Sequence, residues 1–224
     1  MKARGSKQIN VVIIEDHRMF REQLAHLIDK AGDMKVSGQT DNIRDGLALI
    51  KQTQPSVVII DITLRGSSGL ELLKDLRAQG IAVPALVLSM HDESLYAERA
   101  LRAGARGYVT KHEASESVLR AIRQILSGEI YLKPQFMSRM ISRMTTGADV
   151  AAEPIDRLTD RELEVFDLIG RGLTTREIAG QLGLGITTVD TYKTRIREKL
   201  NLENSAQLRF AASRWVQLRE QPTG

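Results

Sequence analysis

Three carboxylates follow directly on two short apolar segments of the chain. Glu15 and Asp16 come after the run that ends at Ile14, and Asp61 comes after the run that ends at Ile60. Short runs rich in β-branched residues are typical of buried parallel strands, and ligands collect outside the carboxyl ends of such strands. We therefore expect these carboxylates to meet at one sheet edge. Clustered acids repel one another unless a hard cation neutralises them, and oxygen ligands of this kind suit Mg²⁺.

Two further polar residues follow predicted strands. Ser89 comes after the apolar run 86–88, and Lys111 lies two residues after Val109. A nucleophilic carboxylate, a hydroxyl, an ammonium and a metal-holding acid pair fit phosphoryl transfer, which depends mostly on positioning and charge neutralisation. In this interpretation Asp61 forms an aspartyl phosphate, and Lys111 and Ser89 contact the phosphoryl oxygens. The predicted Mg²⁺ ligands are Glu15, Asp16, Asp61 and the backbone carbonyl of Thr63.

Composition excludes several classes of protein. The chain of 224 residues has no cysteine, which excludes disulfide scaffolds, thiolate zinc sites and cysteine nucleophiles. No apolar run approaches the roughly 20 residues that span a bilayer, and the basic N-terminus lacks the apolar stretch of a signal peptide. We expect a cytoplasmic protein. The formal net charge of +4 permits nucleic-acid binding without arguing for it.

The first half of the chain alternates short apolar runs with amphipathic stretches. Strands are expected near residues 9–14, 35–39, 56–60, 85–89 and 106–109, with the weakest apolar pattern around Val36. A last amphipathic helix is expected over residues 115–127. Alternation of this kind requires a parallel sheet covered by helices on both faces. The predicted fold class is α/β, a doubly wound sheet of five parallel strands, followed by a small all-α domain.

The composition changes between Gly128 and Pro154, and helical patterns begin again near Leu158. This change predicts a first domain over residues 8–128, a linker with a short helix near Pro134 over 129–154, and a second domain over 155–219. Helix starts in the second domain are indicated by capping boxes. The predicted boxes pair Thr159 with Glu162, Thr174 with Glu177, and Asn204 with Gln207.

The helices predicted near 174–182 and 187–200, with a glycine-containing turn between them, have the spacing of a helix-turn-helix. On the second helix, Val189, Tyr192, Ile196 and Leu200 fall along one stripe, to which Lys193 lies close. Threonines on the other side can contact base edges, and basic residues can neutralise phosphates. The predicted DNA contacts are Thr187, Thr188, Thr191, Lys193, Thr194, Arg195 and Arg197.

With the acid pair, Asp61, Ser89 and Lys111 in this order, residues 9–127 resemble the receiver domain of bacterial two-component response regulators. The resemblance implies a flavodoxin-like fold in which a histidine kinase phosphorylates Asp61. It also implies a switch in which Ser89 and Tyr108 shift inward together. Residues 155–215 resemble the LuxR-type DNA-binding domain, so the whole chain is similar to the NarL/FixJ class. That class implies a transcription regulator, not an enzyme, which binds double-stranded DNA as a homodimer.

The chain departs from the family pattern at several positions. The loop after Asp61 has no proline where receivers often have one, and Met90 follows Ser89 where many receivers have a smaller residue. Met90 could narrow access to the phosphate and lengthen its lifetime. Asp190 and Tyr192 stand where the DNA-binding family often has Lys and His. We favour the interpretation that Asp190 caps the helix dipole over the alternative that it accepts a cytosine amino proton.

Three alternatives compete with this interpretation. A Mg²⁺-dependent phosphohydrolase could use Asp61 as its nucleophile, but the haloacid-dehalogenase-like enzymes have a second Asp where this chain has Thr63. The receiver could also act as a docking domain that is never phosphorylated. The C-terminal helices could form a module that binds only protein, and the last helix, with Trp215, could serve the core or a dimer.

Overall fold

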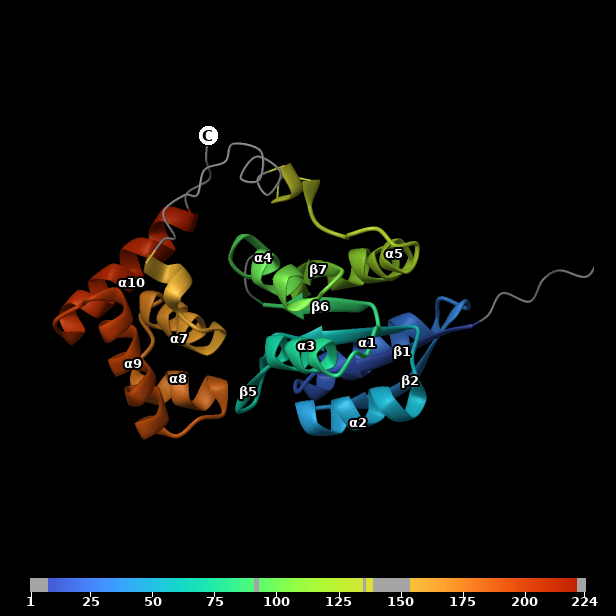
Figure 1. Cartoon of the computed structure of the whole chain (residues 1–224), viewed down its shortest axis with the longest axis horizontal. Coiled ribbons are helices and arrows are strands. Elements are labelled where there is room, and N and C mark those ends of the chain that lie inside the picture. Colours follow the sequence, from blue (N-terminus) through green and yellow to red (C-terminus); the bar gives the residue numbers. More distant parts are fainter. Residues whose placement is uncertain (1–7, 91–92, 135, 139–153, 221–224) are drawn as a thin grey trace, which may run out of the picture. The chain divides into compact units, whose positions relative to one another are not determined.

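The computed structural model describes residues 8–90, 93–134, 136–138 and 154–220. The chain divides into two compact units, residues 1–145 and 146–224, which run from blue to yellow and from orange to red in Figure 1. Most of the predicted linker, residues 139–153, lies outside the described residues. The domain limits 8–128 and 155–219 stay predictions. In the described part of the chain, no helix is long and apolar enough to cross a membrane.

The first unit contains the predicted sheet of five parallel strands, which confirms the α/β fold class. The strands lie in the order β2-β1-β3-β6-β7 and pair in parallel throughout. Because β1 and β3 are neighbours at the centre of the sheet, their carboxyl ends deliver the acids after both strands to the same edge. Their bounds are β1 (Ile9–Ile14), β2 (Met34–Thr40), β3 (Val57–Asp61), β6 (Ala85–Ser89) and β7 (Gly107–Thr110).

Helices cover both faces of this sheet. One face packs against α1 (Arg18–Asp29) and α5 (Ala114–Leu126), which share a buried apolar cluster with alternate residues of β1, β3, β6 and β7. On the other face, α2 (Ile43–Thr53) lies so close to β1 that a Cβ on Gly46 would come 2.7 Å from Ile14. The helices α3 (Gly69–Ala78) and α4 (Glu93–Ala103) pack against each other, and α4 packs against β7.

A small antiparallel hairpin follows the central aspartate, and the sequence pattern did not predict it. It joins β4 (Thr63–Leu64) to β5 (Ser67–Ser68) through Gly66, whose φ of +74° suits glycine. The next residue, Gly69, begins α3 where a Cβ would lie 2.0 Å from the Asp61 carbonyl oxygen. Only glycine fits there, so the hairpin and α3 can pack directly against the end of β3.

The segment after α5 lies along the edge strand β7. Tyr108 donates a backbone hydrogen bond of 3.0 Å to the Tyr131 carbonyl, and Tyr131 donates one of 3.0 Å to the Arg106 carbonyl. The Arg120 guanidinium donates to the Tyr131 hydroxyl at 3.0 Å. This segment therefore satisfies backbone groups that would otherwise be unpaired at the edge of the sheet.

The second unit is all helical, as predicted. It contains the short η2 (Pro154–Arg157), α7 (Asp160–Gly170), α8 (Thr175–Leu182), α9 (Ile186–Leu200) and α10 (Ser205–Glu220). The capping boxes of Thr159 with Glu162 and of Thr174 with Glu177 are confirmed. The helices pack around α7, whose Phe166 ring lies 5.5 Å from the Trp215 ring of α10.

The third predicted capping box is wrong in one half. Asn204 does cap α10, because its Oδ1 accepts hydrogen bonds from the backbone amides of Ala206 and Gln207. The Gln207 side chain instead accepts from the Glu203 amide at 2.8 Å and so reaches one residue further back than a capping box requires.

Candidate functional site

Three carboxylates gather at the carboxyl edge of the sheet. Oxygens of Glu15, Asp16 and Asp61 all lie within 4.8 Å of one another. Glu15 and Asp61 are buried, whereas Asp16 is partly exposed. The first two acids follow β1 and the third ends β3, so the parallel pairing of these strands brings them together.

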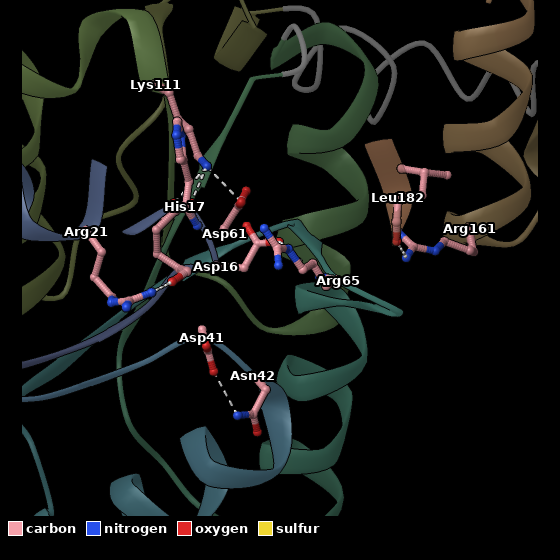
Figure 2. A network of polar contacts seen from close by, with 11 residues as sticks. Asp16, His17, Arg21, Asp41, Asn42, Asp61, Arg65, Lys111, Arg161 and Leu182 are labelled. Atoms are coloured by element: carbon pink, nitrogen blue, oxygen red, sulfur yellow. Dashed lines mark hydrogen bonds and ion pairs between the residues drawn. The ribbon is translucent and has the colours of Figure 1, made fainter. Parts of the chain in front are cut away.

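Lys111, the residue after the edge strand β7, completes this cluster. The Lys111 ammonium lies 2.7 Å from Asp61 Oδ2 and 2.7 Å from Glu15 Oε2, and its side chain is only 7% exposed. Figure 2 shows the Lys111 side chain extended toward the Asp61 carboxylate. The ammonium also lies 5.0 Å from the centre of the Phe20 ring, a favourable cation–π distance.

One ammonium does not neutralise this much negative charge. Burial, followed by the charge of Glu15, raises the pKa of Asp61 to about 7, although Lys111 and the Thr63 amide act in the opposite direction. Burial lowers the pKa of Lys111, but the carboxylates of Asp61 and Glu15 outweigh it, and the net pKa is raised. The lysine therefore stays charged, while the ionised form of Asp61 is disfavoured.

Backbone amides and two arginines orient the acidic groups. The Thr63 amide donates to Asp61 Oδ1 at 3.2 Å, and the His17 amide donates to Glu15 Oε1 at 3.0 Å. Arg65 donates its amide to Asp16 Oδ2 at 3.1 Å, and Figure 2 shows these two side chains beside each other. In addition, the Arg21 guanidinium donates to the carbonyl oxygen of Glu15.

The acidic cluster fits a small hard cation. Oxygens bound to one octahedral Mg²⁺ lie about 3.0 Å apart when adjacent and about 4.2 Å apart when opposite, given metal–oxygen distances near 2.1 Å. Adjustments of less than about 1 Å would bring the three carboxylates within that range from their present separation of up to 4.8 Å. A divalent cation would also remove the excess negative charge that raises the Asp61 pKa. The Thr63 carbonyl stays a predicted fourth ligand.

Ser89 and Tyr108, the predicted switch residues, lie on neighbouring strands. Ser89 ends β6 and is buried, one residue beyond Leu88, which pairs with Asp61 in the sheet. Tyr108 on β7 is 1% exposed. Both side chains are therefore inside the unit and near the carboxyl edge.

A cavity of about 430 Å³ adjoins Lys111. Met19 and Met90, two exposed methionines, lie on its lining, together with His17 and His112. Met90 thus lines the same pocket as Lys111. Its effect on phosphate lifetime stays a prediction.

The second unit contains the predicted pair of helices. Ile178, Ala179 and Leu182 form the buried side of α8, and Gly183 ends this helix with a φ of +63°. On α9, Val189 and Ile196 are buried, while Tyr192 and Leu200 are half-buried. The predicted DNA contacts on the exposed side are Thr187, Thr188, Thr191, Thr194 and Arg195, and Arg197 is half-buried.

Lys193 differs from the other predicted contacts. Its ammonium donates a hydrogen bond of 2.9 Å to the hydroxyl of Thr175, the first residue of α8. This contact ties α9 to α8, and the side chain is half-buried. The ammonium has three N–H donors, so this hydrogen bond leaves others for DNA, and the role of Lys193 as a DNA contact stays a prediction.

Two family models match the two units separately. Residues 11–123 match the response regulator receiver domain, and residues 156–212 match the bacterial regulatory proteins of the luxR family. The chain belongs to the response regulators. It is a two-component response regulator with a receiver and a LuxR-type domain, and a DNA-binding transcription regulator, as the resemblance in its sequence implied.

Two transcription regulators of known sequence match nearly the whole chain. The virulence transcription regulator BvgA of Bordetella pertussis is 36% identical, over 91% of this chain and 96% of its own. The transcriptional regulatory protein DesR of Bacillus subtilis is 34% identical, over 88% of this chain and 92% of its own.

Solved structures of response regulators share the fold. A LuxR-family response regulator from Aurantimonas sp. SI85-9A1 is 28% identical, covers 62% of this chain and 99% of its own, and has a TM-score of 0.57. RcsB of Salmonella enterica, bound to promoter DNA, is 23% identical over 92% of this chain and 99% of its own, with a TM-score of 0.58.

The structure of this response regulator adds residues that the sequence pattern missed. Arg65 lies in the hairpin after β3 and donates to Asp16, 49 residues earlier, so no local pattern indicates the contact. Phe20 has the spacing of a core residue on α1, yet its ring also faces the Lys111 ammonium. Arg21 binds a backbone carbonyl, which leaves no pattern in the sequence.

Proposed function

We propose that Asp61 accepts a phosphoryl group from a histidine kinase and that this modification controls DNA binding by the LuxR-type domain. One observation carries the proposal: the buried Asp61 carboxylate lies 2.7 Å from the Lys111 ammonium, beside the carboxylates of Glu15 and Asp16. A lone buried carboxylate would be protonated and inert. Its ordered neighbours instead hold it where a phosphoryl group can be received and neutralised.

Transfer requires an ionised Asp61, because a carboxylate oxygen forms the new bond to phosphorus while the bond from phosphorus to the donor breaks. The Thr63 amide holds one Asp61 oxygen and Lys111 holds the other. After transfer, Lys111 pairs with a phosphoryl oxygen and the Ser89 hydroxyl donates to another. Glu15, Asp16, Asp61 and the Thr63 carbonyl would hold Mg²⁺, which would supply further positive charge to the phosphoryl group.

The modified receiver would then favour one of two conformations. Phosphate can shift such an equilibrium only through contacts that differ between the two states. Ser89 and Tyr108 are the residues that would change position, because the first lies beside the phosphoryl site and the second lies on the neighbouring strand.

The DNA-binding side of the function rests on α9 as the recognition helix. Its exposed threonines would contact base edges, and its basic residues would contact phosphates. A homodimer would read two half-sites related by its symmetry. We place this activity in the cytoplasm, and we assign the chain no enzymatic turnover of its own.

Intact-mass measurement tests the phosphoryl acceptor. The wild-type protein and Asp61→Asn are incubated with acetyl phosphate and Mg²⁺, and DNA binding of both is then measured at one stated salt concentration. A phosphate adduct in the wild type alone, with a change in DNA affinity, supports the proposal. An adduct in Asp61→Asn would overturn the assignment of Asp61 as the acceptor. An adduct in the wild type that leaves DNA binding unchanged would overturn the proposal that phosphorylation regulates DNA binding.

The same samples separate the rival functions. Rapid turnover of a generic phosphate ester that is lost in Asp61→Asn would favour a phosphohydrolase, which the threonine at position 63 argues against. A wild-type protein that forms no adduct but binds DNA would favour a receiver that acts only by docking.

A further inference from the structure

Asp190 is an acidic residue on the recognition helix of a protein that must approach a polyanion. The helix α9 begins at Ile186, so Asp190 lies in its second turn, and the first turn contains no acidic residue. The attraction of a carboxylate to the helix dipole falls off within the first turn. The interpretation of Asp190 as a dipole cap therefore has little structural support.

The surroundings of the Asp190 carboxylate do not account for its presence. Its side chain is 58% exposed, and its nearest cation is the Lys193 ammonium at 3.6 Å. That ammonium is already directed to Thr175 by a shorter contact of 2.9 Å. Among the residues that the structure describes, none donates a hydrogen bond to the Asp190 carboxylate. The group is therefore available to an external donor.

The threonines around Asp190 restrict which external groups this face can bind. Thr191 donates its hydroxyl proton to the Thr187 carbonyl at 2.9 Å, and Thr194 donates its own to the Asp190 carbonyl at 3.1 Å. Their hydroxyl protons are thus used within the helix. The Thr194 oxygen also accepts from the Arg197 guanidinium at 3.4 Å. The Asp190 carboxylate and the Thr191 oxygen are therefore the acceptors at the centre of this face that are complementary to donors on base edges.

DNA offers such donors in the major groove only as exocyclic amino groups. The adenine amino group lies beside the N7 acceptor of the same base, which would repel a carboxylate, whereas cytosine presents its N4 amino group without an adjacent acceptor of its own. Repulsion from the phosphates makes an unpaired carboxylate unfavourable in the groove. We propose that Asp190 selects cytosine at one position of each half-site by accepting a hydrogen bond from its N4 amino group.

This inference rests on the proposed role of α9 as the recognition helix. Its test begins with selection of binding sites from a random duplex library by the full-length protein, after treatment with acetyl phosphate and Mg²⁺. Selection is repeated with Asp190→Ala, Asp190→Asn and the control Glu198→Gln, which removes an exposed acid two turns further along the same helix. Affinities for all four base pairs at each selected position are then measured at constant salt.

The wild type should favour cytosine at one position by roughly 5- to 150-fold, the range for one mismatched base pair. Asp190→Ala should lose this preference. Asp190→Asn should change it to adenine, because an amide side chain pairs with adenine N6 and N7. Glu198→Gln should retain the wild-type preference. Circular dichroism checks that each variant is folded.

Two outcomes would overturn the inference while leaving DNA binding intact. In the first, Asp190→Ala tightens binding to every duplex alike, which would mean that the carboxylate only repels phosphates. In the second, Asp190→Asn selects the same bases as the wild type. If the wild-type protein selects no DNA motif, the proposed role of α9 as the recognition helix is wrong, and this inference fails with it.

Discussion

Replacement of Asp61 by asparagine should stabilise the receiver at neutral pH and leave it nearly unchanged in acid. Folding raises the pKa of Asp61 from its ordinary 3.8 to about 7, because burial and Glu15 disfavour its charge. A raised pKa means that the folded state binds the proton more tightly than the unfolded chain does. The stabilising contribution of that proton is complete below about pH 4, and it is lost as pH rises to about 7.

The size of this effect follows from the pKa difference. About three pKa units, at about 1.4 kcal/mol each, give an upper limit of about 4 kcal/mol between pH 4 and pH 8. The amide that Asp61→Asn introduces carries no titrating proton, so this pH dependence should be missing from the variant. The pH dependence of groups remote from Asp61 cancels in the comparison of the two proteins, including that of Glu162, whose pKa is lowered in the fold.

Urea unfolding at several pH values in EDTA measures the difference. The one tryptophan of the chain, Trp215, lies in the second unit, so its fluorescence reports that unit. Far-ultraviolet circular dichroism follows the unfolding of both units. The unfolding transition of the receiver is the one seen by circular dichroism but not by Trp215 fluorescence. A wild-type receiver that gains stability relative to Asp61→Asn from pH 4 to pH 7 would refute the reasoning.

Three further substitutions test the site. Lys111→Met leaves two buried carboxylates without their cation, so receiver stability should fall by about 3 kcal/mol in urea and acetyl phosphate should no longer modify the protein; wild-type labelling would contradict this. Gly69→Ala places a Cβ 2.0 Å from a carbonyl oxygen and should destabilise the receiver by about 2 kcal/mol, whereas Gly180→Ala, with no atom within 4 Å, should stabilise its helix slightly. Met90→Ala should shorten the lifetime of the phosphorylated form, and an unchanged half-life would exclude that role.

The parallel sheet was predictable because most of its strands are buried on both faces. Four consecutive apolar residues make up most of β1 and of β3, and the acids next to these runs mark the ends of the strands. β2 gave a weak pattern for a physical reason. It lies at one edge of the sheet, most of its residues are only partly buried, and Met34 is its one fully buried residue.

The hairpin after β3 was not predictable from periodicity. Its strands have two residues each, which is too short for an alternating pattern, and they form only because the chain turns at Gly66 and packs on the end of β3. Arg65 reaches Asp16 through this turn. Contacts of this kind depend on tertiary structure, and the sequence near each residue contains no record of them.

The misread capping residues have a similar origin. Spacing predicted a box between Asn204 and Gln207, but the glutamine side chain had two backbone amides within reach and took that of Glu203. The helix starts themselves lie where the sequence predicts them, since α9 begins at Ile186 and Asn204 caps α10. The direction that a side chain takes from a helix start is what spacing alone does not determine.

The electrostatics of the acidic cluster give the receiver its sensitivity to ligands. The Glu15 and Asp61 carboxylates share one buried ammonium, and burial together with the Glu15 charge raises the pKa of Asp61, so further positive charge would stabilise the ionised cluster. Any group that supplies such charge stabilises the ionised cluster, and phosphorylation replaces one carboxylate by a group of larger negative charge. In the proposed function, the same imbalance that lowers the stability of the unmodified fold would make cations and phosphate the species that change its conformation. A fully neutralised cluster would be more stable and less responsive.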